Sequence, residues 1–233
     1  MKICFFQHDP LENPGYILEW AKDRGHKTSF VNFYEDSALP EINGIEALVI
    51  MGGPMNVGDA ADEYSWLEAE GEFIKQFIHS GKKTFGICLG SQMIADAMGA
   101  KVYRNQHTEI GWHKVIVDQA KIPDRYAGIF PDEFMTFHWH GYTFDIPEGC
   151  AGFIRSEATG NQAFIHGNVA AFQFHPEMTK QGVLKLVEKH EEVFVKYYPF
   201  IQSRNEIVEA DNHFEINRTL LFKFLDRFFD QER

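Results

Sequence analysis

Cys88 stands between Gly86 and Gly90, where a short apolar run over residues 84–87 gives way to a helical pattern over residues 91–98. The run predicts a buried strand and the pattern predicts a helix. A tight turn between these elements requires small residues beside its tip, and each glycine lies two positions from the cysteine. The segment therefore predicts a nucleophile elbow, a strained turn that exposes one side chain at the end of a strand.

The N-terminal half repeats this alternation of strand and helix. Apolar runs over residues 3–7, 29–33 and 47–51 predict strands, and helical patterns over residues 16–21 and 66–79 are each followed by a glycine. Successive strand–helix–strand units favour parallel pairing with helices on both sides. We therefore expect an α/β fold with an open, mostly parallel sheet and helices on both faces.

The pattern changes over residues 101–173, where short β-like runs are separated by turns. These runs cover residues 102–103, 114–117, 152–155, 162–165 and 170–174. They predict a mixed or antiparallel extension of the sheet.

The last 55 or so residues return to helical spacing. Apolar stripes at Val183, Leu184 and Val187, and later from Leu220 to Phe228, predict helices that pack against the body of the protein. No segment rich in Gly, Pro or Ser separates them from the rest. We expect one domain over residues 1–233, with a core of about 1–180 and a helical C-terminal extension of about 181–233.

Composition excludes several classes of function. The formal net charge is −12 and no basic patch stands out, so we expect no binding to nucleic acid or to anionic membranes. The three cysteines, Cys4, Cys88 and Cys150, are odd in number and lack a C-x-x-C spacing, which argues against a disulfide framework. With no signal peptide or membrane span expected either, the chain is interpreted as a cytoplasmic protein whose thiols stay reduced.

A nucleophilic cysteine needs a base and a group that orients the base. His175 and Glu177 follow the apolar run over residues 170–174, separated by Pro176. Residues two apart in an extended chain project to the same side, so the carboxylate is expected to fix the imidazole tautomer. A histidine at a strand end is more often structural when it stands alone. Together with the elbow it predicts a Cys88–His175–Glu177 triad.

Acyl transfer also requires donors for the oxyanion that develops on the substrate. The residue after the nucleophile commonly supplies one backbone N–H, here that of Leu89. A second is expected from Gly53, because the Gly52-Gly53-Pro54 turn follows the predicted strand over residues 47–51. Ligands of open α/β sheets bind at this edge.

Two further histidines, His138 and His140, are spaced to share a strand face. A metal site would need at least one more ligand, and no third ligand stands at a telling spacing. We therefore expect structural or substrate-lining roles for them, and neither a metal nor a cofactor.

Three segments, 52–54, 86–92 and 175–177, resemble in residue type, order and spacing the signatures of class I glutamine amidotransferases. The nearest resemblance is to the glutaminase domain of GMP synthetase and its free-standing relatives, which residues 109–112 and 138–147 also resemble. The resemblance implies a flavodoxin-like open α/β sheet and hydrolysis of the glutamine side-chain amide through a γ-glutamyl thioester. Cys88 would be the nucleophile, His175 the general base and then acid, and Glu177 its orienting carboxylate.

The resemblance also implies substrate contacts. Gln92 would help hold the glutamine, and the backbone near Trp139 and His140 would bind its amino-acid end. The family often has an acidic residue where this chain has Tyr142, a departure that bears on the contact with the substrate amino group. Family members usually pass ammonia to a synthase, and no ATP-pyrophosphatase domain or P-loop is found here. The protein is therefore expected either to act as a free-standing glutaminase or to supply ammonia to a separate synthase subunit.

Other functions remain open on the sequence. The same triad would serve a hydrolase of γ-glutamyl peptides or conjugates, and Tyr142 with residues 55–63 is where the two substrates would be distinguished. A pseudoenzyme that binds a partner or senses a metabolite is a third possibility, against which the intact triad argues. An α/β-hydrolase with a cysteine nucleophile is a fourth, but its acid would precede the histidine by a long stretch, whereas Glu177 follows His175.

Overall fold

The computed structural model of the protein describes residues 1–58, 64–195 and 198–230. In chain order, the strands are β1 (Lys2–Gln7), β2 (Lys27–Asn32), β3 (Ala47–Ile50), β4 (Lys83–Ile87), β5 (Val102–Val117), β6 (Glu133–Phe144), β7 (Ala151–Ser156), β8 (Ala163–His166) and β9 (Val169–Phe172). The α-helices are α1 (Gly15–Asp23), α2 (Leu67–His79), α3 (Leu89–Ala97), α4 (Lys180–Lys189), α5 (Arg204–Val208) and α6 (Asn212–Phe229).

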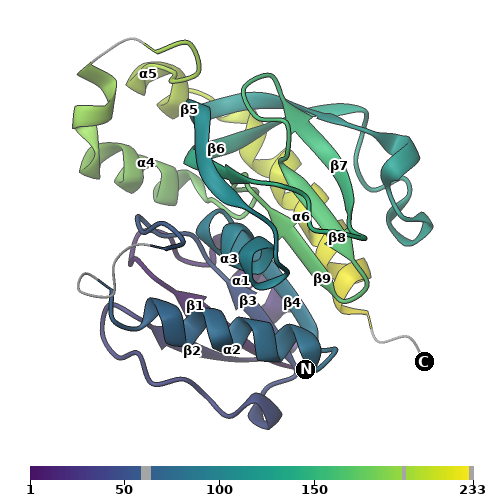
Figure 1. The fold of residues 1–233 in the computed structure, drawn as a ribbon. Helices are drawn as coiled ribbons and strands as arrows, with labels where there is room; N and C mark the ends of the chain where they lie inside the picture. The colour runs from purple at the N-terminus through teal and green to yellow at the C-terminus, as the bar shows by residue number, and fades with distance from the viewer. Residues whose placement is uncertain (59–63, 196–197, 231–233) are drawn as a thin grey trace.

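These strands form a single sheet in the order β2-β1-β3-β4-β9-β8-β7-β5-β6 (Figure 1). Along this order, neighbouring strands pair in parallel in the first part of the sheet, which consists of β2, β1, β3, β4 and β9. In the second part, which runs from β9 through β8, β7 and β5 to β6, neighbouring strands pair antiparallel. The expected parallel sheet with a mixed extension is therefore confirmed. The carboxyl ends of β1, β3 and β4 reach one edge together, and this edge positions the site described below.

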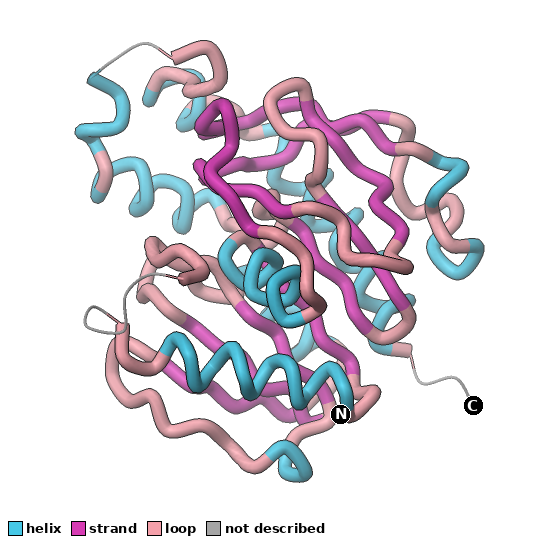
Figure 2. Tube along the Cα trace, viewed as in Figure 1, coloured by secondary structure: helices cyan, strands magenta, loops and turns pink. Residues whose placement is uncertain are grey.

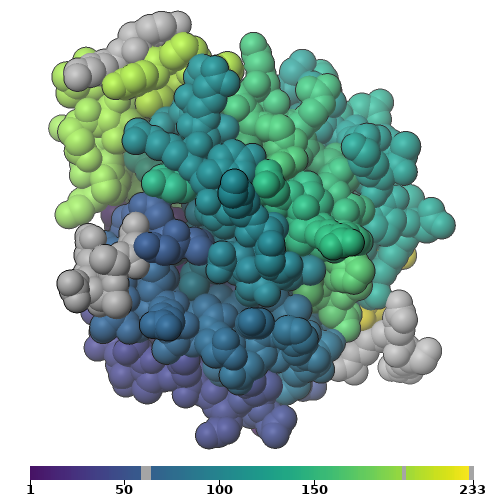
Figure 3. Space-filling model, viewed as in Figure 1, coloured from purple at the N-terminus to yellow at the C-terminus, as the bar shows by residue number. Residues whose placement is uncertain are grey.

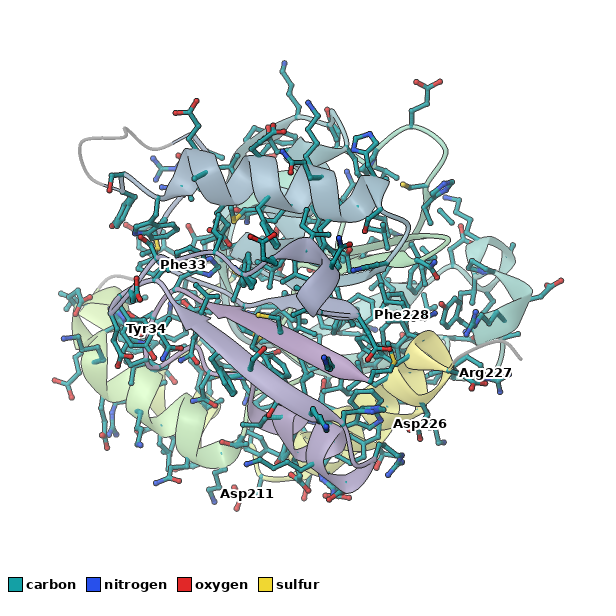
Figure 4. All side chains as sticks on the ribbon, turned by 90° about the horizontal axis from the view of Figure 1, so that it is seen from below. Phe33, Tyr34, Asp211, Asp226, Arg227 and Phe228 are labelled. Carbon is teal, nitrogen blue, oxygen red and sulfur yellow. The ribbon has the colours of Figure 1, made fainter. Side chains whose placement is uncertain are left out.

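Helices cover both faces of the parallel half, as expected (Figures 1 and 2). The helices α2 and α3 share one apolar cluster with one side of the strands, and α1 and α6 share another with the opposite side. Strand β3 is buried along its whole length, as expected for a parallel strand covered on both sides. Figure 4 shows these layers from below, with α2 on one side of the sheet and α6 on the other.

The helix α6 belongs to the main core. Its residues Leu221, Phe224, Leu225 and Phe228 are at most 1% exposed, and each such side chain contributes roughly 1.5–3 kcal/mol by its burial. On its other side, Asp226 (labelled in Figure 4) accepts a hydrogen bond from the Trp20 indole at 2.8 Å, which ties α6 to α1.

The structure joins two runs that the sequence pattern had separated. The predicted runs over residues 102–103 and 114–117 are the two ends of the 16-residue strand β5. The pattern fails between them because that part carries exposed polar residues and a register shift between Arg104 and Glu109. Its partner β6 was not predicted as a strand, because residues 138–142 combine histidines with glycine and tyrosine.

Residues 200–202 extend the sheet locally beside β5. The Ile110 N–H donates to the Phe200 carbonyl at 2.9 Å, and the Gln202 N–H donates to the Ile110 carbonyl at 3.0 Å. The Gln202 side-chain amide then bonds both the N–H and the carbonyl of Trp112, at 2.7 and 2.8 Å. Gly111 permits this approach, because a Cβ there would lie 2.4 Å from the Gln202 amide oxygen. The chain between α4 and α5 is thereby fixed to β5.

Within the ranges that the structure describes, no helix is both long enough and apolar enough to cross a membrane.

Candidate active site

Cys88 occupies the predicted elbow between β4 and α3. Its φ of 50° and ψ of −109° make it the one non-glycine residue with positive φ in the described parts of the chain. Such a conformation costs roughly 1–3 kcal/mol and persists where the surroundings enforce it. Here both flanking glycines are enforced by packing. A Cβ on Gly86 would lie 2.5 Å from the Gly90 backbone, and one on Gly90 would lie 2.2 Å from the Ile50 carbonyl oxygen.

His175 and Glu177 lie beyond the end of β9, in the loop that leads to α4. The His175 Nδ1 and a Glu177 carboxylate oxygen are 2.9 Å apart, and both side chains are buried. The His175 backbone N–H donates to the Phe137 carbonyl at 2.8 Å, and the Glu177 carbonyl accepts from the Tyr16 N–H at 2.9 Å. Backbone contacts to β6 and α1 thus hold the pair in place, although the residues are not in a strand.

The structure brings this pair to the elbow. The Cys88 sulfur and a His175 ring nitrogen lie within 4.8 Å of each other. Since Glu177 takes Nδ1, Nε2 is the nitrogen available to the thiol, and it has no other hydrogen bond within the described residues. This arrangement of thiol, imidazole and carboxylate is the one that a nucleophile, a base and an orienting group would need for covalent acyl transfer.

Burial raises the pKa of the Cys88 thiol, and the neighbouring His175 only partly opposes it. Burial also acts to lower the pKa of His175, but the Glu177 carboxylate and Cys88 outweigh it and raise that pKa well above its ordinary value. Loss of water around the sulfur therefore has the largest effect on the pKa of this thiol. Among its neighbours, His175 is the group that favours the thiolate of Cys88.

A cavity of about 230 Å³ opens beside Cys88. It is smaller than the roughly 300–1,000 Å³ of pockets that enclose drug-sized ligands, and so suits a substrate of amino-acid size. All five residues predicted for the oxyanion or the substrate line it, namely Gly53, Leu89, Gln92, Trp139 and His140. The Gln92 amide is fixed by a hydrogen bond to the Gln173 side chain at 3.1 Å.

Several residues that line this cavity were not predicted from the sequence. Thr108 and Ile110 come from β5, and Leu186 and His190 from the α4 region, so the C-terminal extension forms part of the wall. Tyr142, singled out for its effect on substrate choice, also lines the cavity. Of the segment considered with it, residues 55 and 56 line the cavity, while 59–63 lie outside the described residues.

Glu12 is the most consequential residue that was missed. It lies in the loop between β1 and α1, with a carboxylate oxygen within 4.8 Å of the Cys88 sulfur and a His175 nitrogen. One of its oxygens is buried without a hydrogen bond in the described residues. Burial raises the pKa of Glu12 to about 7, and the attraction of His175 only partly opposes this. Its place at the carboxyl edge of a parallel strand was the signal that could have revealed it.

We expect Glu12→Gln to stabilise the protein at alkaline pH. The folded protein binds a proton at Glu12 up to about pH 7, whereas the unfolded chain releases it near 4.5. Stability is therefore lost as pH rises between these values, and the variant avoids the loss. The gain should be absent at pH 4 and approach about 3 kcal/mol at pH 8, measured by urea unfolding. Glu68→Gln, an exposed change on α2, is the control. A gain that does not vary with pH would contradict the prediction.

A buried polar cluster lies under the cavity wall formed by β6. The Glu109 carboxylate is 3.3 Å from His140 Nε2 and 3.5 Å from His138 Nδ1. Glu109 is thus a third polar group beside the two histidines, which it reaches through the pairing of β5 with β6, so no sequence spacing indicated it. The same Glu109 oxygen accepts hydrogen bonds at 2.8–3.1 Å from three further side chains, those of Ser156, Thr159 and Gln162.

This arrangement suits a hydrogen-bonded network better than a metal site. His140 faces oxygen acceptors with both ring nitrogens, Glu109 through Nε2 and the Tyr142 carbonyl at 3.1 Å through Nδ1. Each His140 nitrogen thus has a protein partner, which leaves neither free for a cation. Burial lowers the pKa of His138 to about 3, so His138 is neutral.

Comparison with known proteins shows the family of this chain. The family model described as glutamine amidotransferase class-I matches residues 16–188. A Salmonella typhimurium protein described as glutamine amidotransferase-like, YfeJ, is 30% identical over 232 residues, which cover 97% of this chain and 96% of the relative. The chain belongs to the class I glutamine amidotransferase family.

Relatives within this family carry different names. A GMP synthase subunit of Thermoplasma volcanium, described as glutamine-hydrolysing, is 30% identical over 167 residues, 69% of this chain and 76% of the relative. Gamma-glutamyl peptidase 3 of Arabidopsis thaliana is 26% identical over 165 residues, 66% of this chain and 64% of the relative. A crystal structure of a glutamine amidotransferase from Methylobacillus flagellatus superposes with a TM-score of 0.91 at 26% identity, covering 100% of this chain and 96% of the other.

Proposed function

We propose that this protein hydrolyses the side-chain amide of glutamine to glutamate and ammonia through a γ-glutamyl thioester on Cys88. The proposal rests on one observation: the strained Cys88 lies beside the buried His175–Glu177 pair, in which His175 Nδ1 and a Glu177 carboxylate oxygen are 2.9 Å apart. Membership of the amidotransferase family supports the choice of an amide substrate.

The reaction follows from the positions of these groups. His175 Nε2 takes the thiol proton as the Cys88 sulfur attacks the amide carbon, and the backbone N–H groups of Gly53 and Leu89 stabilise the oxyanion. The intermediate collapses by breaking the C–N bond, and His175 returns the proton to the departing nitrogen, which leaves as ammonia. A water molecule, deprotonated by His175, then attacks the thioester and releases glutamate and the Cys88 thiol.

The substrate is held by the other residues of the cavity. We propose that Gln92 and the backbone near Trp139 and His140 contact it, since all three line the 230 Å³ space beside the nucleophile. The ammonia would pass to a separate synthase subunit in the cytoplasm. The name of the Thermoplasma relative, which describes one subunit of a glutamine-hydrolysing synthase, supports this partner.

A second candidate is hydrolysis of a γ-glutamyl peptide or conjugate by the same triad. The likeness to a plant gamma-glutamyl peptidase favours it, as does Tyr142, an uncharged residue in the cavity wall. Both candidates place the γ-glutamyl carbonyl against Cys88 and differ in the group that leaves. A non-catalytic sensor is the remaining alternative.

Active-site labelling distinguishes these functions. We expect a diazo-ketone analogue of glutamine to add once, to Cys88, and excess glutamine to block the addition, as measured by intact-protein and peptide mass spectrometry. Cys150 provides an internal control, because burial raises the pKa of its thiol to about 11 and keeps it protonated.

The other outcomes are equally informative. Protection by γ-glutamyl peptides but not by glutamine would favour the second candidate. Absence of any label on Cys88 would contradict both hydrolase proposals and leave the sensor.

A further inference from the structure

A buried ion pair lies behind the Gly52-Gly53 turn. His8 follows β1 and Glu70 lies on α2, and both side chains are 0% exposed. The His8 Nε2 donates to a Glu70 carboxylate oxygen at 2.9 Å, and its Nδ1 donates to the Gly52 carbonyl at 3.1 Å. Neither residue lines the cavity beside Cys88, and the reaction described above does not use them.

The surroundings of His8 favour its charged form. Both ring nitrogens face oxygen acceptors, so both donate and the ring is an imidazolium. Burial acts to lower the pKa of His8, but the Glu70 carboxylate outweighs it and the pKa is raised. The ring packs against both Phe33 and Trp66, at centroid distances of 5.2 and 5.6 Å, and aromatic faces attract a cation. Phe33 is labelled in Figure 4, between α2 and the sheet.

The hydrogen bond from His8 determines how one peptide group is turned. The Gly52 carbonyl and the Gly53 N–H belong to the same planar trans peptide, so they point in opposite directions. With the carbonyl directed to His8, the N–H points away from His8, and Gly53 lines the cavity together with Cys88.

The turn needs such an anchor. Glycine has no Cβ to restrict rotation, so a peptide between two glycines turns over easily. Turned over, it would present a carbonyl oxygen to the developing oxyanion in place of a donor. Both glycines are nevertheless required by packing, because a Cβ on Gly52 would lie 1.8 Å from a Glu12 oxygen and one on Gly53 would lie 2.7 Å from the His8 Cβ.

We propose that His8 and Glu70 are positioning residues that hold the Gly52–Gly53 peptide with its N–H directed at the oxyanion. The proposal rests on the function proposed for Cys88 and Gly53. Glu70 keeps His8 charged, and charged His8 can donate to the peptide and to Glu70 at once. A neutral ring has a single N–H and could donate to only one of them, so the Glu70 carboxylate would compete with the Gly52 carbonyl for that N–H.

Two substitutions of His8 separate these roles. In His8→Asn the side-chain amide nitrogen replaces Nδ1 and can still donate to the Gly52 carbonyl. In His8→Gln it replaces Nε2 and can reach only Glu70. Loss of one oxyanion donor costs roughly 10²–10³-fold in kcat, so we expect a fall of about 10²-fold for His8→Gln and less than about 10-fold for His8→Asn. KM for the compound that the wild type hydrolyses, glutamine or a γ-glutamyl peptide, should stay unchanged.

Two further measurements distinguish a positioning role of His8 from a general loss of active-site structure. Iodoacetamide alkylates Cys88 by direct displacement without an oxyanion, so its rate should be equal in the wild type and both variants. Crystal structures should show the Gly52–Gly53 peptide turned over in His8→Gln and unchanged in His8→Asn. Glu70→Gln, which keeps the shape of the pair, should lower kcat by less than His8→Gln, because neutral His8 can still donate from Nδ1.

Each failure has a distinct meaning. Unchanged kcat and an unturned peptide in His8→Gln would overturn the inference, and so would equal losses of turnover and alkylation in both His8 variants. If the wild type hydrolyses neither compound, the proposed function fails. The crystal structure of His8→Gln then still decides whether His8 orients the peptide, because the orientation is observed without turnover.

Discussion

Cys88→Ala should reduce hydrolysis of the glutamine or γ-glutamyl amide to background, a loss of roughly 10⁶-fold in kcat. Without the sulfur no thioester forms, and the His175–Glu177 pair has nothing to deprotonate except water. Release of ammonia or of the γ-glutamyl leaving group provides the assay. The variant should remain folded, because alanine also fits the tight turn between β4 and α3.

The matched control for this change is Cys150→Ala. Cys150 is a half-buried cysteine outside the cavity, and its removal should leave turnover within about twofold of the wild type, as for a surface change distant from the site. Turnover by Cys88→Ala at the level of the wild type would overturn the mechanism.

The second large effect concerns stability. Glu109→Gln removes the buried carboxylate that lies beside His138 and His140 and accepts three side-chain hydrogen bonds. Breaking a buried charged network in this way costs about 3–5 kcal/mol. The free energy of unfolding from urea or guanidinium titration measures it. Glu133→Gln is the control: Glu133 pairs with Lys114 at 3.0 Å, but both side chains are more than half exposed, so the change should cost less than about 1 kcal/mol.

The pH dependence of this loss of stability provides a second test. His138 and His140, with other donors, hold the pKa of Glu109 well below its ordinary value of 4.5 although burial opposes them. A depressed pKa stabilises the folded state above the ordinary value, and this contribution is lost as pH falls below it. The difference in stability between the wild type and Glu109→Gln should therefore be full at pH 7 and shrink in acid. A difference that grows below pH 4 would refute the assignment of Glu109 as a buried carboxylate stabilised by this cluster.

The parts of the fold that follow local patterns were predictable. Cys88 between two glycines implied the turn, and the continuous apolar run over residues 47–51 implied a buried parallel strand, because each signal lies within a few residues. His175 and Glu177 were paired correctly by their spacing, with their ring nitrogen and carboxylate 2.9 Å apart. The assignment of catalytic roles to them stays a prediction.

The missed parts are set by contacts between distant segments. Glu109 meets His140 through the pairing of β5 with β6, and 62 residues separate His8 from Glu70. Neither sequence separation repeats with the period of a helix or a strand, so no local pattern reveals these contacts. Glu12 was missed because a single acid in a loop after a strand resembles any solvent-exposed acid until the fold buries it. The length of β5 was missed because its first half carries exposed polar residues and a register shift.

The attachment of residues 200–202 beside β5 bears on how the protein avoids pairing with its own copies. Within the described residues, Ile110 and Trp112 direct backbone hydrogen-bonding groups away from β6, and Phe200 and Gln202 satisfy them (Figure 3 shows the α4–α5 region in yellow-green beside the teal β5). Uncovered, those groups would form an open strand edge able to recruit a strand from another molecule. Gln202 covers the edge with a side-chain amide in place of a peptide. A chain ending before residue 200 would therefore lose this protection against self-association, together with part of the support of the cavity.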